Sequence, residues 1–336
     1  MAHACDTNNQ ACRYPFVFTT TNGAKLPAKQ PFNPSVKLEN NPLLNQTLNA
    51  DQPDDTMLDT QAKSQFEDFL AQPDTQINLA QGALMVARLE YPELDITTYL
   101  QRIEQMAQDI RASLPTNPNA AETLARLNHV LFVEQGYEGN SSHYYDPRNS
   151  FLNDVIDRKL GIPISLSILY IELARVLGVP LDGVSFPGHF LVKLEIDNGA
   201  IVLDPYFGGI SLTEDDLEDR IQEYYGEQLK RHHYQGLLVT SSKKDIIVRV
   251  MRNLRNLYMQ EKQWEKALTM ADTMVGLDTD IADAVKARAV IYDSLECCQP
   301  ALRDYKEWLR LDPGSQDHQD IRKRVSELGE TCRHMS

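Results

Sequence analysis

The chain has 336 residues, of which 42% are hydrophobic and 24% charged, enough for about two or three domains with ordinary buried cores. It holds 33 Lys and Arg against 48 Asp and Glu, a net charge of −15, which argues against direct nucleic-acid binding because that needs clustered positive charge. No apolar run approaches the ~20 residues of a membrane span and the first residues resemble no signal peptide, so we expect a cytoplasmic protein without membrane contact.

The first part of the chain divides into a polar tail and a helical region. Residues 1–60 are rich in Asn, Gln, Thr, Pro and Asp, a composition that predicts a disordered or loosely attached tail. From about residue 65, apolar residues recur at helical spacing. Three helices are expected: one at 77–89, one that Asp95 caps and Pro115 ends, and one at 120–135.

Residues 136–150 read as a loop that mixes aromatic and polar side chains, among them Tyr144, Tyr145 and Asn149. Tyrosines combine an apolar ring with a polar tip, which suits a ligand site. The same tyrosines would also serve to cover the edge of a core. Both interpretations stay open on the sequence.

A buried helix and a β-hairpin are predicted in the middle of the chain. Residues 165–177 are apolar on most sides, which is typical of a central helix. At 190–196 the apolar period changes to two, Asn198-Gly199 favours a tight turn, and residues 200–203 return as a second strand. Two further segments follow: an acidic helix at 213–225 and a basic loop at 230–233.

The C-terminal third contains a repeat of 34 residues. The matching pairs are Tyr258 and Tyr292, Ala267 and Ala301, and Leu277-Asp278 with Leu311-Asp312. This period predicts tetratricopeptide repeats, a paired-helix unit, although Arg255 stands where the pattern usually has a small residue. Two repeats are few for a free-standing solenoid, so we expect them to pack on the preceding domain.

The five cysteines lie near the two ends of the chain. An odd count at scattered positions is a poor disulfide framework. The spacing of Cys5 and Cys12 fits no common zinc pattern. Cys297 and Cys298 are interpreted as packing or loop residues of the helical repeat.

Three motifs occur in order within residues 144–209: Gly-Ile-Pro-Ile-Ser at 161–165, Pro-Gly-His-Phe at 187–190 and Leu-Asp-Pro at 203–205. Together they resemble the transglutaminase-like core of the bacterial SirB family, and the resemblance covers about residues 77–312. It implies an α+β protein with a helical N-terminal region, a transglutaminase-like (papain-like) core with a small antiparallel sheet, and C-terminal α-helical tetratricopeptide repeats. The expected parts are the tail at 1–60, the helical region plus core at 61–245, and the repeats at 246–330.

The resemblance implies His189 as a base and Asp204 as the acid that orients it, but the nucleophile is missing. In transglutaminase-like hydrolases a cysteine opens the central helix. Here that position falls between Pro163 and Ser165, and residues 13–296 contain no cysteine. The Ser165 hydroxyl would depend fully on a base to react, and serine is also a preferred residue for capping a helix. Both roles of Ser165 stay open.

Strand parity tests whether His189 and Asp204 can meet. If Asn198 and Gly199 form a two-residue turn, Lys193 faces Asp204, and His189 shares their sheet face. That register separates His189 from Asp204 by roughly 13 Å along the strand. A direct hydrogen bond therefore requires a wider loop or a bulge.

We expect a non-catalytic protein with a regulatory or protein-binding role, which holds a protein or peptide partner in the tetratricopeptide groove and needs no cofactor or metal. The alternative is a hydrolase or acyl-transfer enzyme that uses Ser165, His189 and Asp204. A third hypothesis is ligand binding without chemistry, and its candidate residues beside His189 are Tyr144, Tyr145, Asn149 and Pro163.

Overall fold

The computed structural model describes residues 64–197, 199–225, 234–277 and 281–334. The predicted tail at 1–60 and the predicted basic loop at 230–233 lie outside the described residues. Helices come first, as the apolar spacing predicts. They are a helix at 64–71, η1 (Asp74–Gln76), α2 (Leu79–Arg88), α3 (Ile96–Ala112), α4 (Ala120–Asn128), the π-helix η2 (His129–Glu134), η3 (Pro147–Asn149) and α5 (Leu152–Arg158).

Three of these helices begin after a side chain that accepts a backbone N–H. Asn78 caps α2, Asp95 caps α3 as predicted, and Asn119 caps α4. Glu122 returns a hydrogen bond to the Asn119 backbone N–H, which completes a capping box. The polar residues between the apolar segments therefore set where these helices start.

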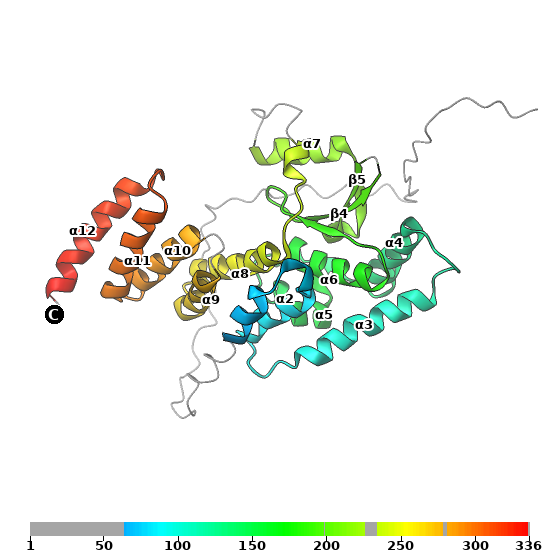
Figure 1. Cartoon of the computed structure of the whole chain (residues 1–336), viewed down its shortest axis with the longest axis horizontal. Helices are drawn as coiled ribbons and strands as arrows, with labels where there is room; N and C mark the ends of the chain where they lie inside the picture. The colour runs from blue at the N-terminus through cyan, green and yellow to red at the C-terminus, as the bar shows by residue number, and fades with distance from the viewer. Residues whose placement is uncertain (1–63, 198, 226–233, 278–280, 335–336) are drawn as a thin grey trace, which may run out of the picture. The chain divides into compact units, whose positions relative to one another are not determined.

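Helix α6 (Pro163–Val176) is the central helix of the core. Every residue from Pro163 to Ala174 is buried, and α6 contacts α2, α3, α4, α5 and the sheet (Figure 1). Pro163 suits the first helical position because its missing N–H would have no partner there. Glu172, although buried, accepts a hydrogen bond from the Leu79 backbone N–H at 3.1 Å. The central helix thus also caps α2.

The main sheet has four antiparallel strands in the order β3-β4-β5-β6. The two strands predicted from the hairpin pattern, β4 and β5, lie at its centre. A separate two-stranded parallel sheet joins the loop after η2 to the head of α6. The strand bounds are β1 (Glu138–Gly139), β2 (Leu160–Gly161), β3 (Asp182–Val184), β4 (Leu191–Ile196), β5 (Gly199–Asp204) and β6 (Ile210–Leu212).

The predicted hairpin register was wrong by two residues. Ile196 pairs with Gly199, and Lys193 pairs with Val202 instead of Asp204. The Gly199 backbone belongs to β5 and pairs with Ile196, so Gly199 is not a central residue of the turn. A shift of two residues keeps every side chain on its predicted sheet face. The strand β4 starts only at Leu191, so His189 lies in the preceding loop. The separation of roughly 13 Å between His189 and Asp204, which assumed that both lie in strands, therefore does not apply.

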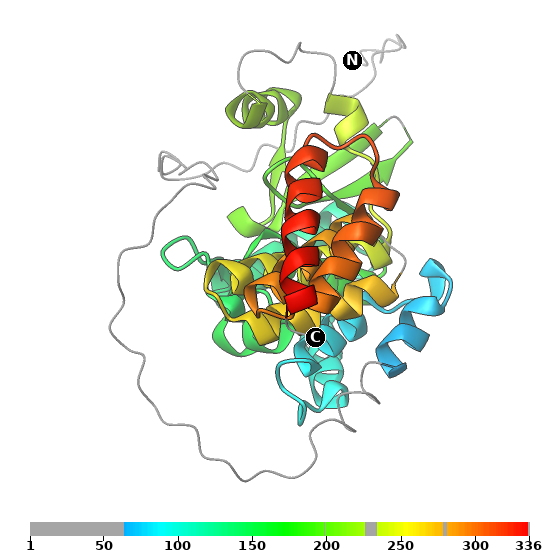
Figure 2. The ribbon, with the colours of Figure 1, turned by 90° about the vertical axis from the view of Figure 1, so that its left-hand side faces the viewer.

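The acidic segment forms helix α7 (Glu214–Tyr225), and the C-terminal part is helical throughout its described residues. Helices α8 (Lys243–Gln260) and α9 (Trp264–Gly276) form the first repeat, and α10 (Ile281–Ser294) and α11 (Cys298–Leu311) form the second. Helix α12 (His318–His334) lies beside α11 (Figure 2). The matching residues Tyr258, Ala267 and Ala301 are buried, as the repeat pattern requires.

The repeats pack on the preceding domain, as expected for so short an array. Helix α8 contacts α2 and α6. The Tyr258 hydroxyl donates a hydrogen bond to Glu90 at 3.1 Å, and Lys266 forms an ion pair with the same carboxylate. Glu90 follows α2 directly, so a single acidic side chain joins the N-terminal helices to both helices of the first repeat.

The unusual Arg255 of the first repeat has a structural explanation. Its side chain is 3% exposed and pairs with Asp283 on α10 at 2.8 Å. At the equivalent place in the second repeat, Ala289 packs with no exposed surface. At this position the first repeat therefore has an ion pair to the second repeat, whereas the second repeat has a buried small residue.

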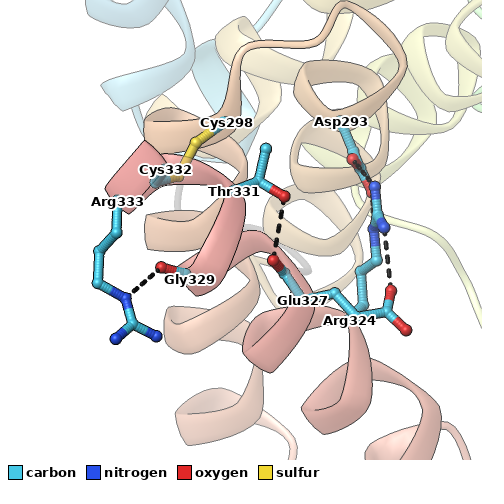
Figure 3. Close-up of a disulfide and its surroundings, with 8 residues drawn as sticks. All are labelled: Asp293, Cys298, Arg324, Glu327, Gly329, Thr331, Cys332 and Arg333. Atoms are coloured by element: carbon cyan, nitrogen blue, oxygen red, sulfur yellow. Dashed lines mark hydrogen bonds and ion pairs between the residues drawn. A yellow bond between two sulfur atoms is a disulfide. The ribbon is translucent and has the colours of Figure 1, made fainter. Parts of the chain in front are cut away.

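Two of the cysteines form a disulfide although their number and spacing make a poor framework, so the interpretation of Cys298 as a packing or loop residue was incomplete. Cys298 at the start of α11 is bonded to Cys332 on α12, with a Cα–Cα distance of 5.9 Å (Figure 3). The antiparallel course of the two helices brings together residues 34 positions apart, which spacing in the sequence does not reveal. Cys297 is an exposed free thiol. Nearby, Arg324 on α12 binds Asp293 on α10 at 2.7 Å.

Candidate functional site

His189 and Asp204 meet at the end of the sheet. The Nε2 atom of His189 lies 3.0 Å from both carboxylate oxygens of Asp204. Asp204 is the last residue of β5 and has no exposed surface. A carboxylate only accepts hydrogen bonds, so Nε2 carries a proton and donates it. In a neutral ring this leaves Nδ1 as the basic nitrogen.

A second partner of Asp204 comes from the acidic helix. Arg220 on α7 donates to Oδ2 of Asp204 at 2.6 Å, and its guanidinium lies 5.6 Å from the centre of the Phe207 ring. Burial alone would raise the pKa of Asp204, but the charge and hydrogen bond of His189, followed by those of Arg220, hold that pKa below its usual value. Asp204 is therefore an ionised anchor for the His189 ring and the Arg220 guanidinium. The Tyr206 backbone N–H completes its hydrogen bonding at 3.1 Å.

A tight loop between β3 and β4 places the His189 ring. The His189 N–H donates to the Phe186 carbonyl at 3.0 Å, and Phe186 and Phe190 are both buried. Gly188 has a φ of +64°, a conformation that side chains disfavour. A Cβ added there would lie 2.7 Å from the Tyr224 ring, so glycine also allows Tyr224 to contact the loop closely.

Aromatic rings surround the other side of His189. Its ring stacks on Phe207 with a 6.1 Å centroid distance and meets the edge of Tyr206 at 5.8 Å. Tyr206 in turn contacts Tyr144 at 6.3 Å, and Tyr144 contacts Tyr145 at 5.4 Å. The predicted ligand-binding tyrosines thus reach His189 through Tyr206. Tyr144 is 36% exposed and Tyr145 52% exposed, so this aromatic chain extends from the histidine to solvent.

The Nδ1 atom of His189 takes no part in the hydrogen bonds that hold the ring on Asp204. Among the described residues it has no hydrogen-bond partner, yet it is not sealed from solvent. A ring held by Asp204 through Nε2, with Nδ1 open, is able to exchange a proton with a bound molecule. The arrangement is therefore complete for a base and its orienting acid.

The Ser165 hydroxyl is committed to the backbone. It donates to the Asn149 carbonyl at 2.5 Å and accepts from the Ile162 N–H at 3.1 Å, and the residue is 1% exposed. Ser165 is the third residue of α6, with Ile162 at the N-cap. No hydrogen bond joins it to His189 in the described part of the chain. Its geometry is that of a capping serine.

Asn149 and Pro163 are buried, unlike the exposed Tyr144 and Tyr145. The Asn149 amide donates to the carbonyls of His143 and Tyr144, and its oxygen accepts from Asn140 at 3.1 Å. Asn149 therefore shapes the loop that carries Tyr144 and joins it to the head of α6 through Ser165.

Sequence reasoning missed Arg220, Tyr206, Phe207 and Arg249 as members of the site. Tyr206 and Phe207 directly follow the Leu-Asp-Pro motif, so their position was a usable signal. Arg220 is the only basic residue of α7, a helix rich in acidic residues. An isolated cation in such a helix was a weaker signal. Arg249 on α8 carried no signal, because the repeat pattern accounts for that helix by itself.

The described residues hold no group of three or more His, Cys, Asp or Glu side chains arranged to bind a metal ion. In that same part of the chain, no helix is long and apolar enough to cross a membrane.

Two protein families match the chain. Residues 97–252 match the transglutaminase-like superfamily, and residues 254–326 match the tetratricopeptide repeat. The first match contains His189, Asp204, Arg220 and Arg249, and the second contains most of the paired helices. No solved structure gives a significant match to the chain.

Curated relatives include bacterial and animal proteins. A UPF0162 protein of Xylella fastidiosa is 38% identical over 256 residues, which cover 76% of this chain and 91% of the relative. Protein SirB1 of Salmonella typhimurium is 23% identical over 248 residues, covering 72% and 88% respectively. F-box only protein 21 of Homo sapiens is 29% identical over 223 residues, but these make up 57% of this chain and only 34% of that protein.

Proposed function

The chain belongs to the UPF0162 family and joins a transglutaminase-like domain to tetratricopeptide repeats, and on that premise we propose that it is a non-catalytic cytoplasmic protein that binds protein or peptide partners and acts as a regulator. The observation that carries this proposal is the state of the Ser165 hydroxyl. It caps the backbone at the head of α6, where a nucleophile would have to stand. Without a nucleophile, the His189–Asp204 pair has nothing to activate.

A binding role is supported by two features. The tetratricopeptide repeat is a paired-helix unit that commonly presents a surface to peptides or partner helices. In the transglutaminase-like domain, the exposed rings of Tyr144 and Tyr145 connect through Tyr206 to a histidine whose Nδ1 atom has no described partner. Tyrosines offer apolar contact area and a hydroxyl for hydrogen bonding at once.

The test is an assay of the purified full chain with thioester, amide and peptide substrates, beside Ser165→Ala and His189→Ala variants. The expected result is no turnover that depends on either residue. Turnover that His189→Ala abolishes would overturn the proposal, and its loss in Ser165→Ala as well would identify a serine enzyme.

A companion experiment checks that the site lacks only the nucleophile. Single cysteines are introduced at positions 163, 164 and 165, and their alkylation rates with iodoacetamide are measured against pH. If the His189–Asp204 pair is placed as in an acyl-transfer site, one cysteine reacts as a thiolate well below the usual thiol pKa of about 8.5. His189→Ala in the same background is the control and should return that cysteine to ordinary reactivity.

A further inference from the structure

Arg249 on α8 lies directly against the histidine loop. Its Nη2 atom donates a hydrogen bond to the His189 carbonyl at 2.7 Å, and its guanidinium lies 5.4 Å from the centre of the Phe190 ring. These contacts hold the cation beside the candidate site. They use only one of the five N–H donors that a guanidinium carries.

Arg249 differs from the other shielded arginines, because no carboxylate of the described residues pairs with it. Arg220, 12% exposed, pairs with Asp204, and Arg255, 3% exposed, pairs with Asp283. Arg288, 14% exposed, pairs with Asp304 and Asp272. Arg249 is also partly buried, but within the described ranges no acidic side chain forms an ion pair with it. A shielded cation without a counter-charge is unusual because its desolvation is not offset.

The unused donors of Arg249 remain reachable. Its Nε and Nη1 atoms have no hydrogen-bond partner in the described part of the chain, and neither is sealed from solvent. Burial lowers the pKa of Arg249, and the like charge of Arg252 lowers it further, whereas Tyr144 and Tyr224 raise it. Tyr144 and Tyr224 are 36% and 50% exposed.

We propose that Arg249 binds the carboxylate of a peptide ligand next to His189, together with Tyr144, which contacts Tyr206 beside the histidine, and Tyr224, whose ring packs on the loop at Gly188. This inference rests on the proposed binding function and names its ligand chemistry. A guanidinium matches a carboxylate with two parallel hydrogen bonds, and the tyrosine hydroxyls supply further donors. The tyrosine rings give the adjoining peptide residues apolar surface to contact.

A single carboxylate suits the site better than a highly charged anion. The chain has a net charge of −15, and the neighbouring helix α7 begins with Glu214, Asp215 and Asp216. A polyanion would meet repulsion from these groups, whereas one carboxylate pairs with Arg249 at close range. The carboxylate comes either from a peptide C-terminus or from an acidic side chain, and the two sources are separated by experiment.

Isothermal titration calorimetry on the full chain tests the inference with four probes. The first pair is acetyl-Ala-Ala-Tyr with a free C-terminus and its C-terminal amide. The second pair is the amides of acetyl-Ala-Glu-Tyr and acetyl-Ala-Gln-Tyr. We expect the acid of at least one pair to bind about tenfold more tightly than its neutral partner, as for a charge-assisted bidentate contact. The pair that shows the preference identifies the source of the carboxylate.

Variants assign the preference to Arg249. Arg249→Gln should remove it, and Arg249→Lys should retain part of it because the charge stays while the planar fork is lost. Arg102→Gln is the control, since Arg102 pairs with Asp157 at an exposed position on α3. Circular dichroism and thermal unfolding check that each variant folds. Should Arg249→Gln not fold, Tyr144→Ala at its exposed position should weaken the preference instead.

Equal binding of acid and neutral probes, no binding by any probe, or an acid preference that survives in folded Arg249→Gln would overturn the inference. A preference unchanged in Tyr144→Ala would do so if Arg249→Gln does not fold. The proposed function fails on a different readout, which is His189-dependent turnover. An enzyme with the acid preference would refute the first proposal and keep the second, and an inactive protein without it would do the reverse.

Discussion

The Nε2 atom of His189 donates to both oxygens of Asp204 at 3.0 Å, although the two residues are 15 positions apart and only Asp204 lies in a strand. The contact exists because β5 ends at Asp204 and the loop before β4 turns at Gly188 to bring His189 over it. Arg220, on α7, donates a hydrogen bond to the same carboxylate. His189, Asp204 and Arg220 therefore form one hydrogen-bonded cluster.

Asp204→Asn is expected to lower the free energy of unfolding by about 3 kcal/mol at pH 7, because removal of one partner leaves Arg220 buried without a counter-charge. The pKa of Asp204 is lowered in the folded state, so its stabilisation is present above the unfolded pKa of about 3.9 and is lost as pH falls through the folded value. Urea unfolding of both proteins between pH 7 and pH 3 measures the difference. It should persist at pH 5 and shrink below about pH 4.

Asp157→Asn serves as the control, because its ion pair with Arg102 is exposed and is worth less than about 1 kcal/mol. If Asp204→Asn were no more destabilising than this variant, Asp204 would not be an ionised anchor.

Ser165→Ala is expected to destabilise the protein by about 1 to 2 kcal/mol through loss of its capping hydrogen bonds. Ser167→Ala, two residues further along α6, should cost much less, since the buried Ser167 hydroxyl has no hydrogen-bond partner among the described residues. Urea unfolding of the two variants at one pH compares them directly. Equal effects would contradict the capping role of Ser165.

Gly188→Ala should disturb the histidine loop. The residue has a positive φ, and the new Cβ would meet the Tyr224 ring at 2.7 Å. Gly178→Ala is the matched control, with a φ of +87° and open space around its Cβ. Both variants lose about 1 kcal/mol to backbone strain, but only Gly188→Ala should move Tyr224 and shift the NMR signals of the His189 ring. Identical spectra for the two variants would argue against close packing of Tyr224 on the loop.

Reduction of Cys298–Cys332 is expected to destabilise the C-terminal helices. The bond closes a segment of 34 residues, which corresponds to about 3 to 4 kcal/mol in the chain-entropy description. Thermal unfolding followed with and without dithiothreitol measures the change, with Cys332→Ser reproducing the reduced value. Cys297→Ser leaves the bond intact and should behave as the unaltered protein does. A reductant effect that persists in Cys332→Ser would point to another cause.

Much of the architecture followed from local pattern. The apolar spacing and the Asp95 cap predicted α3, the all-round apolar run predicted α6, and the 34-residue period predicted the paired helices. Strands β1, β2, β3 and β6 were missed, since each has only two or three residues and too short a pattern to show alternation. The hairpin register was wrong by two residues because the Asn-Gly signal did not reveal that Gly199 belongs to the strand.

The sequence by itself determined which residue types are available: a histidine and an aspartate in ordered motifs, no cysteine at the head of the central helix, and two helical repeats. Only the tertiary structure decided how they are used. It committed the Ser165 hydroxyl to Asn149, placed Arg220 on Asp204, bonded Arg249 to the His189 carbonyl, and joined Cys298 to Cys332. These outcomes depend on contacts between residues far apart in the chain, and local periodicity carries no information about such contacts.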